Sequence, residues 1–325
     1  MATDALLTDY VLPRLPPCAR NEQIENLATT LVQAVPVEEL GFVGFEYSLL
    51  GDAAGFDLFL RFSRSSGRAK RFVQQIVASG ITAREPAWDQ ALAFFAAWHN
   101  DAGAFADFDD VWLEFDLRAA PAEAPGPSLF WHARHDQSTV PLPDTAPAVF
   151  DALGGRAGEL RAWQAGAQGL SAFCTPEPST VAAGLMLSRD PVTFRACVLS
   201  RRPQTDQGVA HLLDNVFGGN PPAVLVEILG LAAPLRIDLD AGFQFAPRIG
   251  IEWFIDRSSS GGAEEVARVI QTLSARGWID PSRAEGLVAF GGLDRAPTDP
   301  TKTWPPSWQL MDRLRGRRST ALGSD

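Results

Sequence analysis

The stretch VWLEFDL at residues 111–117 decides the fold class, because its side chains alternate between two kinds of residue. One set is wholly apolar and the other combines an aromatic ring with two carboxylates: Val111, Leu113, Phe115 and Leu117 against Trp112, Glu114 and Asp116. Successive side chains of a β-strand point to opposite faces of the sheet. The stretch therefore predicts a strand with one side toward a hydrophobic core and a second side of mixed character.

The same alternation extends outward from this stretch in both directions along the chain. It occurs in DLFLRFSR (57–64), SLFWHAR (128–134) and LRIDLD (235–240), and further extended runs are expected at 42–50, 181–188, 192–200 and 247–255. The mixed faces carry Phe59, Trp112, Phe130 and Phe254, aromatic rings that an open sheet would leave in water. A closed antiparallel barrel turns this face into a lumen, so we expect a barrel, with an open α+β sheet as the alternative.

Helices are predicted in pairs between the strand pairs. The expected ranges are 22–34, 67–78, 86–99, 144–154, 156–166, 205–217, 221–231, 262–276 and 281–290, several of them marked by proline in the first turn or glycine after the last. The order helix, helix, strand, strand recurs as a structural repeat without obvious sequence identity. We predict an α+β protein: an antiparallel β-barrel of repeated α-α-β-β units with the helices outside.

Composition and charge exclude several classes of protein. The chain has 325 residues, a net charge of −11 and a pI near 4.9, so it repels a phosphate backbone and nucleic acid is not an expected partner. No apolar run is long enough for a membrane helix, and residues 1–17 lack the regions of a secretion signal. Cys18, Cys174 and Cys197 have no metal-ligand spacing. We therefore expect a cytoplasmic protein with neither a membrane partner nor a bound metal.

The repeat and several short strings resemble the ABBA-type aromatic prenyltransferases, which have a barrel of α-α-β-β units, and are closest to their fungal indole branch. Residues 45–48 (FEYS) are similar to the Glu-x-Ser of the first strand in that branch. Residues 60–62 (LRF) are similar to its second-strand arginine, and residues 247–252 (PRIGIE) resemble its arginine-led strand. The resemblance covers residues 22–292, and we expect this range to form a single barrel domain.

The chain departs from the family pattern in its aromatic positions. Where the family has Lys-x-Tyr, this chain has Ser128 and Phe130. Where the family has its later Arg-x-Lys-x-Tyr, this chain has residues 248–252, RIGIE, so the tyrosines of both motifs are missing. The whole chain has two tyrosines, whereas 20 phenylalanines and 9 tryptophans could supply aromatic walls.

The two ends of the chain are expected to lie outside the barrel domain. Residues 1–21 form an N-terminal extension, and residues 293–325 form a segment rich in proline and arginine. A fifth strand pair is not visible after Gly292. The barrel either closes with fewer strands or lacks its final pair.

The resemblance implies a catalytic and diphosphate-binding site in the lumen. Glu46 would orient an N–H group of the acceptor or accept its proton. Arg61, Arg195 and Arg248 would bind an allylic prenyl diphosphate, the co-substrate, and stabilise its departure. No other cofactor is expected, and a requirement for Mg²⁺ stays open.

Aromatic and polar side chains would complete the substrate-binding face. Trp112 and Phe130 would shelter the allylic carbocation from water. Glu114, His132 and Arg236 belong to the same face by alternation. The predicted function is transfer of a prenyl group to an aromatic small molecule or a peptide-borne acceptor.

The alternative function is that of a non-catalytic binding or accessory protein that uses the same lumen for a peptide or small molecule. The acids and bases of the lumen nearly balance: Glu46, Glu114, Asp116, Asp238, Asp240 and Glu252 against Arg61, Arg134, Arg195, Arg236 and Arg248, with His132. Arginine–carboxylate pairs across the strands would satisfy most of them. This balance and the missing tyrosines favour the alternative, whereas Glu46 and Arg61 favour the enzyme.

Two side chains have both a chemical and a structural interpretation. His132 and Asp136 could bind a metal ion, although a strand-end cluster satisfied by neighbours and water is favoured. Cys197 shares the face of Arg195 and could act as a nucleophile, although a small core residue is favoured.

Overall fold

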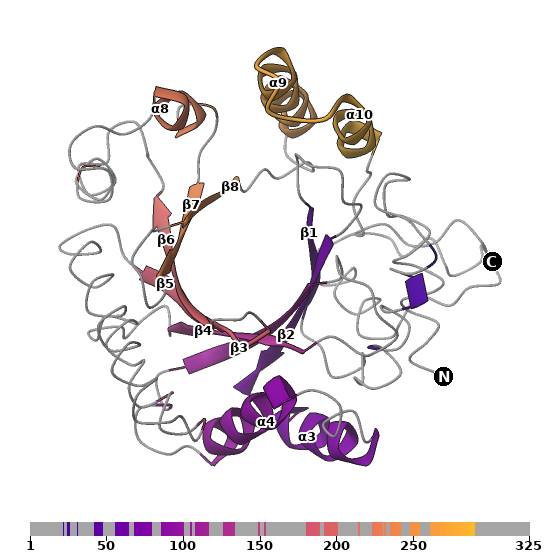
Figure 1. The fold of residues 1–325 in the computed structure, drawn as a ribbon, viewed down its shortest axis with the longest axis vertical. Coiled ribbons are helices and arrows are strands. Elements are labelled where there is room, and N and C mark those ends of the chain that lie inside the picture. Colours follow the sequence, from indigo (N-terminus) through magenta and orange to yellow (C-terminus); the bar gives the residue numbers. More distant parts are fainter. Residues whose placement is uncertain are drawn as a thin grey trace, which may run out of the picture.

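Eight strands form one antiparallel sheet in the computed structural model, and each strand pairs with the next one along the chain. The sheet curls strongly, and the helices lie outside the curl (Figure 1). The strands are β1 (Phe42–Tyr47), β2 (Phe56–Ser63), β3 (Phe108–Asp116), β4 (Ser128–Ala133), β5 (Thr180–Met186), β6 (Thr193–Ser200), β7 (Leu235–Ala241) and β8 (Arg248–Trp253).

The structure describes only part of the chain. The described residues are 22, 25–26, 31, 42–47, 56–64, 68–79, 86–100, 105, 108–116, 126–133, 149, 153, 180–188, 192–200, 214, 223–229, 231, 235–241, 248–253 and 261–289. The expected helix at 156–166, the two terminal segments, and most of the expected helices at 22–34, 144–154 and 205–217 lie outside these residues.

The predicted helices that fall on described residues are confirmed. They are α3 (Arg68–Ser79), α4 (Pro86–His99), α8 (Ala223–Leu229), α9 (Gly262–Ala275) and α10 (Pro281–Ala289). Pro86 and Pro281 each occupy the first helical position, where a missing backbone N–H is tolerated. None of the described helices combines the length and the apolar character that a membrane span requires.

The convex face of the sheet packs on α3 and α4 through aromatic rings. Val111, Leu113 and Phe115 are fully buried, as the alternation predicts. The ring of Phe62 in β2 lies 4.5 Å from that of Phe72 in α3, measured between centroids. On the same face the ring of Trp131 lies 6.2 Å from that of Phe94 in α4. Burial of this aromatic area joins two helices to three consecutive strands.

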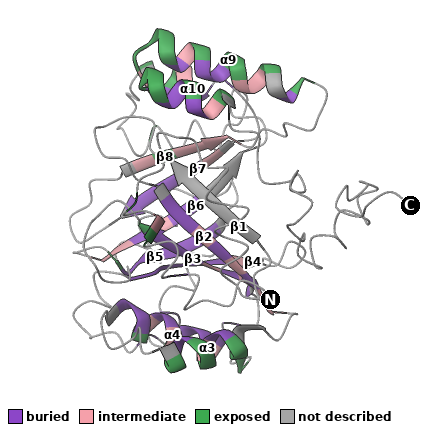
Figure 2. Cartoon of the chain, turned by 90° about the vertical axis from the view of Figure 1, so that its right-hand side faces the viewer, coloured by how far each residue is buried: buried purple, intermediate pink, exposed green. Residues whose placement is uncertain are grey.

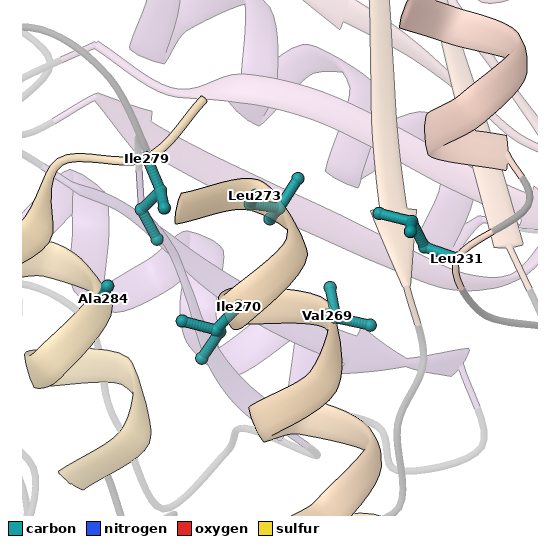
Figure 3. Packing of buried hydrophobic residues seen from close by; sticks show 6 residues of the cluster. All are labelled: Leu231, Val269, Ile270, Leu273, Ile279 and Ala284. Atoms are coloured by element: carbon teal, nitrogen blue, oxygen red, sulfur yellow. The ribbon is translucent and has the colours of Figure 1, made fainter. Parts of the chain in front are cut away.

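A second apolar cluster holds α9 against α10 (Figure 3). Its buried members are Leu231, Val269, Ile270, Leu273, Ile279 and Ala284, and Trp253 at the end of β8 packs against them. The outward sides of α9 and α10 are largely exposed (Figure 2). The cluster therefore ties the last strand of the sheet to the helix pair that follows it.

The seven pairings from β1 to β8 give an α+β fold with a curled antiparallel sheet. In the part of the chain that the structure describes, β8 is not paired with β1. The expectation of a helix-covered antiparallel sheet is thus met, while the described residues form an open curl.

Candidate functional site

The concave face of the sheet carries most of the predicted site residues, and several lie in one row. The pairing registers connect this row across all eight strands: Phe42, Arg61, Trp112, Phe130, Gly184, Arg195, Asp240 and Arg248. Each position is directly opposite the next one in the neighbouring strand. Alternation along each strand then puts residues two positions away on the same concave face.

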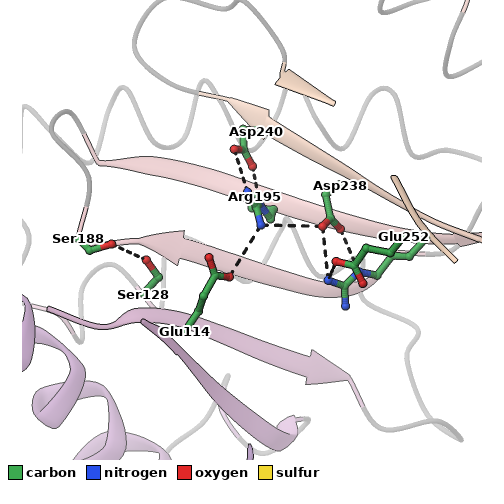
Figure 4. Close-up of polar contacts among 8 residues, drawn as sticks. Glu114, Ser128, Ser188, Arg195, Asp238, Asp240 and Glu252 are labelled. Atoms are coloured by element: carbon green, nitrogen blue, oxygen red, sulfur yellow. Dashed lines mark hydrogen bonds and ion pairs between the residues drawn. The ribbon is translucent and has the colours of Figure 1, made fainter. Parts of the chain in front are cut away.

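Arg195 is the centre of an ionic network on this face (Figure 4). Its Nε lies 2.6 Å from Asp240 Oδ1 and its Nη2 lies 3.2 Å from Asp240 Oδ2, a two-pronged contact across β6 and β7. Its Nη1 lies 3.8 Å from Glu114 Oε2 and 3.9 Å from Asp238 Oδ2. Two strands, β3 and β7, therefore direct three carboxylates to one guanidinium group.

Arg236 continues the network toward β8. Its Nε lies 3.0 Å from Asp238 Oδ1, and its Nη2 forms an ion pair with Glu252. Asp238 thus contacts both arginines, and its side chain is only 4% exposed. Because the two arginines share one buried carboxylate, a change at either is expected to affect the other.

A glycine in the row decides where the ring of Phe130 lies. A Cβ atom at Gly184 would overlap that ring, so the bare backbone of β5 gives Phe130 its place. The guanidinium carbon of Arg195 lies 5.8 Å from the centroid of the same ring. Phe130 also packs with Ala182, Met186 and Cys197. Aromatic contact and carboxylate contact therefore act on Arg195 together.

A second cationic and aromatic group lies on β2, β3 and β4. Arg61 forms an ion pair with Asp110, and its guanidinium carbon lies 5.6 Å from the centroid of a Trp112 ring. The Trp112 and His132 rings are stacked, with centroids 5.2 Å apart and planes 23° apart. The side chain of Arg61 is 39% exposed, compared with 12% for Arg195.

Among the described side chains of the concave face, carboxylates outnumber guanidinium groups. Seven carboxylates face three guanidinium groups: Asp57, Asp110, Glu114, Asp116, Asp238, Asp240 and Glu252 against Arg61, Arg195 and Arg236. The near balance expected from alternation included Glu46, Arg134 and Arg248, whose side chains lie outside the described residues, so it stays a prediction. Alternation left out Asp57, the first residue of the stretch DLFLRFSR, and Asp110, which lies before the stretch VWLEFDL.

The protonation states in the network follow from its contacts. Burial opposes the charged form of Arg195, but the hydrogen bond to Asp240 and the attraction of Glu114 and Asp238 outweigh it and raise its pKa above the usual value. Burial, and then the nearby Asp238, raise the pKa of the Cys197 thiol well above its usual value. Cys197 is completely buried, which fits a core residue and not a nucleophile.

No protein-family model, curated protein or solved structure matches this chain. The site is therefore interpreted from its own geometry.

The backbone alone places the two remaining predicted residues. Glu46 is opposite Asp57 where β1 pairs with β2, and Arg248 is opposite Asp240 where β7 pairs with β8. The side chains of both, together with Arg134 and Asp136, lie outside the described residues. Among the residues that are described, no group of three or more His, Cys, Asp or Glu side chains is arranged to hold a metal ion.

The structure thus brings the predicted residues together in two groups. Glu114, Arg195 and Arg236 share the ionic network with Asp238 and Asp240. Arg61, Trp112 and His132 form the second group. Four strand steps in the register separate Arg61 from Arg195, about 19 Å along the sheet at about 4.8 Å per step.

Proposed function

We propose that the chain is a binding protein that takes up a small organic molecule on the concave face of its sheet. The observation that carries this proposal is the pairing of all three described arginines on that face with carboxylates. Each of these arginines holds its carboxylate partner in place, and each carboxylate holds its arginine. Polar side chains held in this way beside aromatic rings are suited to orienting a ligand.

The aromatic floor supports an organic ligand. Phe130, Ala182, Met186 and Cys197 form a buried cluster on the concave side, and the partly buried Trp112 packs against it. Apolar walls with a few convergent polar groups are typical of small-molecule sites. The ligand would cover the ring of Trp112 and contact the polar frame at the end of the row that holds Arg195.

A neutral apolar dye tests this binding function. We expect Nile red to bind to the wild-type protein, and Trp112→Ala to weaken binding about tenfold, the effect of losing an aromatic contact worth about 1.4 kcal/mol. Trp278→Ala is the matched control, because Trp278 is also partly buried but packs in the cluster of α9 and α10. Equal binding by both variants and the wild-type protein would place the dye elsewhere and contradict the proposal.

Prenyl transfer is the second candidate function, and Arg61 is the observation that favours it. Arg61 is the most exposed of the three arginines and lies beside Trp112 and His132, where a diphosphate and a prenyl chain could both find contacts. In this candidate the described elements belong to an ABBA-type barrel of α-α-β-β units. The position of α3 and α4 between two strand pairs supports that arrangement.

Charge separates the two candidates. A diphosphate requires a local excess of donors and positive charge, whereas the three described arginines of the concave face are each already paired with a carboxylate. Calorimetric titration with a non-hydrolysable allylic thio-diphosphate distinguishes them. We expect no micromolar binding by the folded protein.

An arginine variant shows where any thio-diphosphate binds. Micromolar binding that is lost in Arg61→Ala and kept in Arg276→Ala would establish the transferase instead. Arg276 is the matched control because it is also exposed and also pairs with one carboxylate, Glu227.

A further inference from the structure

We propose that Gly184 determines how large a ligand the concave face accepts, because it holds the ring of Phe130 out of the space that the ligand uses. This inference rests on the binding function proposed above and names the class of its ligand: an apolar molecule with a broad ring system, which reaches from Trp112 past Phe130. Gly184 is in this sense a positioning residue, since it acts on the ligand through Phe130.

Gly184 and Phe130 lie at the middle of the row on the concave face. Phe130 is opposite Trp112 where β3 pairs with β4, and opposite Gly184 where β4 pairs with β5. All three residues therefore belong to the same face of the sheet. A ligand that covers Trp112 meets the position of Phe130 next, one strand spacing away, about 4.8 Å.

The ring of Phe130 fills the place that a side chain at Gly184 would occupy. A Cβ atom there would lie 2.2 Å from Cδ1, 2.4 Å from Cε1 and 2.9 Å from Cγ of Phe130. The ring thus leans from β4 over β5, and the guanidinium carbon of Arg195 in β6 lies 5.8 Å from its centroid. Phe130 is only 5% exposed, whereas Trp112, which packs against it, is partly buried. Trp112 is therefore the more accessible of the two rings.

The presence of glycine at this position needs a reason. Glycine weakens the interior of a strand, and it often marks a place where another group approaches the backbone closely. Here the approaching group is the Phe130 ring. An aromatic ring packed over a glycine of the neighbouring strand also stabilises a sheet. The stability of a variant therefore does not identify the role of Gly184, whereas a changed preference between large and small ligands does.

A side chain at residue 184 would force the ring of Phe130 toward the inside of the curl. Buried residues of β5 and β6 surround the ring on the side of the sheet: Ala182, Met186 and Cys197. Close packing leaves the ring little room in that direction. It would therefore move into the space beside Trp112, where it would exclude broad ring systems before narrow ones.

Two neutral probes of different size test the proposal on the full-length protein. Nile red has a broad fused ring system, and indole has a narrow one. We expect Gly184→Ala to weaken the binding of Nile red about tenfold, an effect that one methyl group in an apolar site commonly has, and to leave the binding of indole nearly unchanged. Dye fluorescence measures the first affinity and ligand-observed NMR the second.

Gly250→Ala is the matched control. It adds the same methyl group to another strand, β8, where the new Cβ would lie 3.3 Å from Asp238 Cβ and not against Phe130. We expect this variant to bind both probes as the wild-type protein does. A loss of Nile red binding as large as that of Gly184→Ala would show that the effect is not specific to Gly184, and would contradict the proposal.

Substitutions of Phe130 show whether its ring carries the effect. Adding Phe130→Leu to Gly184→Ala removes the ring that the new methyl group displaces, and we expect most of the affinity for Nile red to return. Phe130→Trp puts a larger ring opposite the unchanged Gly184, and it should weaken the binding of Nile red more than that of indole. This variant tests the same contact if Gly184→Ala does not fold.

The outcomes separate this inference from the binding function on which it rests. If Trp112→Ala weakens the binding of Nile red, but the folded variants of Gly184 and Phe130 change the affinities of both probes by the same factor, the binding function stands and size selection by Gly184 is wrong. Weak binding of Nile red that persists in the folded double variant would also overturn the role of the Phe130 ring. If Trp112→Ala leaves the binding of Nile red unchanged, both proposals are wrong.

Discussion

On the convex face of the sheet, β2 to β4 pack aromatic rings against α3 and α4, whereas on the concave face β3 and β6 to β8 direct guanidinium and carboxylate groups toward one another. The convex core is assembled from elements that are close in sequence. The concave network joins residues such as Arg195 and Asp240, which are 45 positions apart.

The two faces differ in what they contribute to folding. Burying aromatic area stabilises the folded state directly. Replacing a buried ion pair by apolar residues is often neutral or stabilising, so such a pair is weak evidence for stability. The comparison suggests that the convex face holds the fold together, and that the concave charges are there to define a ligand environment.

The largest expected effect is on the convex face. Trp131 is fully buried and contacts the rings of Phe94, Phe108 and Phe194. We expect Trp131→Ala to lower the free energy of unfolding by about 3–5 kcal/mol in urea titrations. Val77→Ala, at an exposed position of α3, is the control and should change it by less than about 0.5 kcal/mol. If Trp131→Ala lowers the free energy of unfolding by less than Arg195→Met does, the concave face and not the convex face contributes more to stability.

Removing the central arginine should have the next largest effect. Arg195→Met leaves Asp240, Glu114 and Asp238 without their shared cation, and we expect a loss of about 3 kcal/mol of stability. Arg276→Met removes an exposed ion pair and should lose less than about 1 kcal/mol. Adding Asp240→Asn to Arg195→Met should recover part of the stability, and further destabilisation would show that the charges are not coupled.

A glycine substitution sharpens the comparison within the concave face itself. Gly184→Ala forces the ring of Phe130 to move, and we expect a loss of about 1–3 kcal/mol from overpacking. Gly250→Ala is the matched control, because its new Cβ would lie 3.3 Å from Asp238 Cβ, a contact that a small shift relieves. If both variants are equally stable in thermal unfolding, the position of the Phe130 ring does not depend on the absence of a side chain at Gly184.

The smallest effect lies outside both faces, at the start of α10. The Asp280 carboxylate accepts a hydrogen bond from the Ser282 hydroxyl and a second one from the Ser282 backbone N–H, which lies 2.9 Å from Asp280 Oδ1. These bonds, the first more than the second, lower the pKa of Asp280. Because the pKa of Asp280 is lower in the folded state than in the unfolded chain, its ionised carboxylate stabilises the folded state at any pH above the unfolded pKa. This stabilisation is lost as the pH falls through the pKa of the folded state. The protection factors of the α10 amides, which correct hydrogen exchange for its intrinsic pH dependence, should therefore decrease in acid. The non-titrating Asp280→Asn should lack this pH dependence, and an unchanged dependence would exclude the carboxylate.

Alternation predicted which face each strand residue occupies, but it could not predict the partners. The strands containing Arg61, Trp112 and Arg195 lie where the sequence indicated, because period-two patterns depend on local residue order. Which residues lie opposite one another depends on the register, which also depends on the geometry of the connecting turns. The pairing of Arg195 with Asp240 therefore needed the structure.

Alternation also left two acids of the concave face out of the predicted set. Asp110 follows Phe108 across an irregularity in the pairing of β3 with β4, so a simple alternation begun at Val111 leaves it out. Asp57 lies opposite Asp116 at the start of β2, before the first leucine of the alternating pattern. The role of Gly184 was equally hidden, because only the register puts it under Phe130.

The row from Phe42 to Arg248 has a consequence for engineering. Each strand contributes one position to it, so eight sites in eight separate strands form a linear array that can be varied one position at a time, with the losses of stability expected above at Arg195 and Gly184. Neighbouring members are one strand spacing apart, about 4.8 Å, roughly the width of an aromatic ring with its contact shell. A library that varies these positions would scan chemical character across the inside of the sheet in regular steps and leave the convex core unaltered.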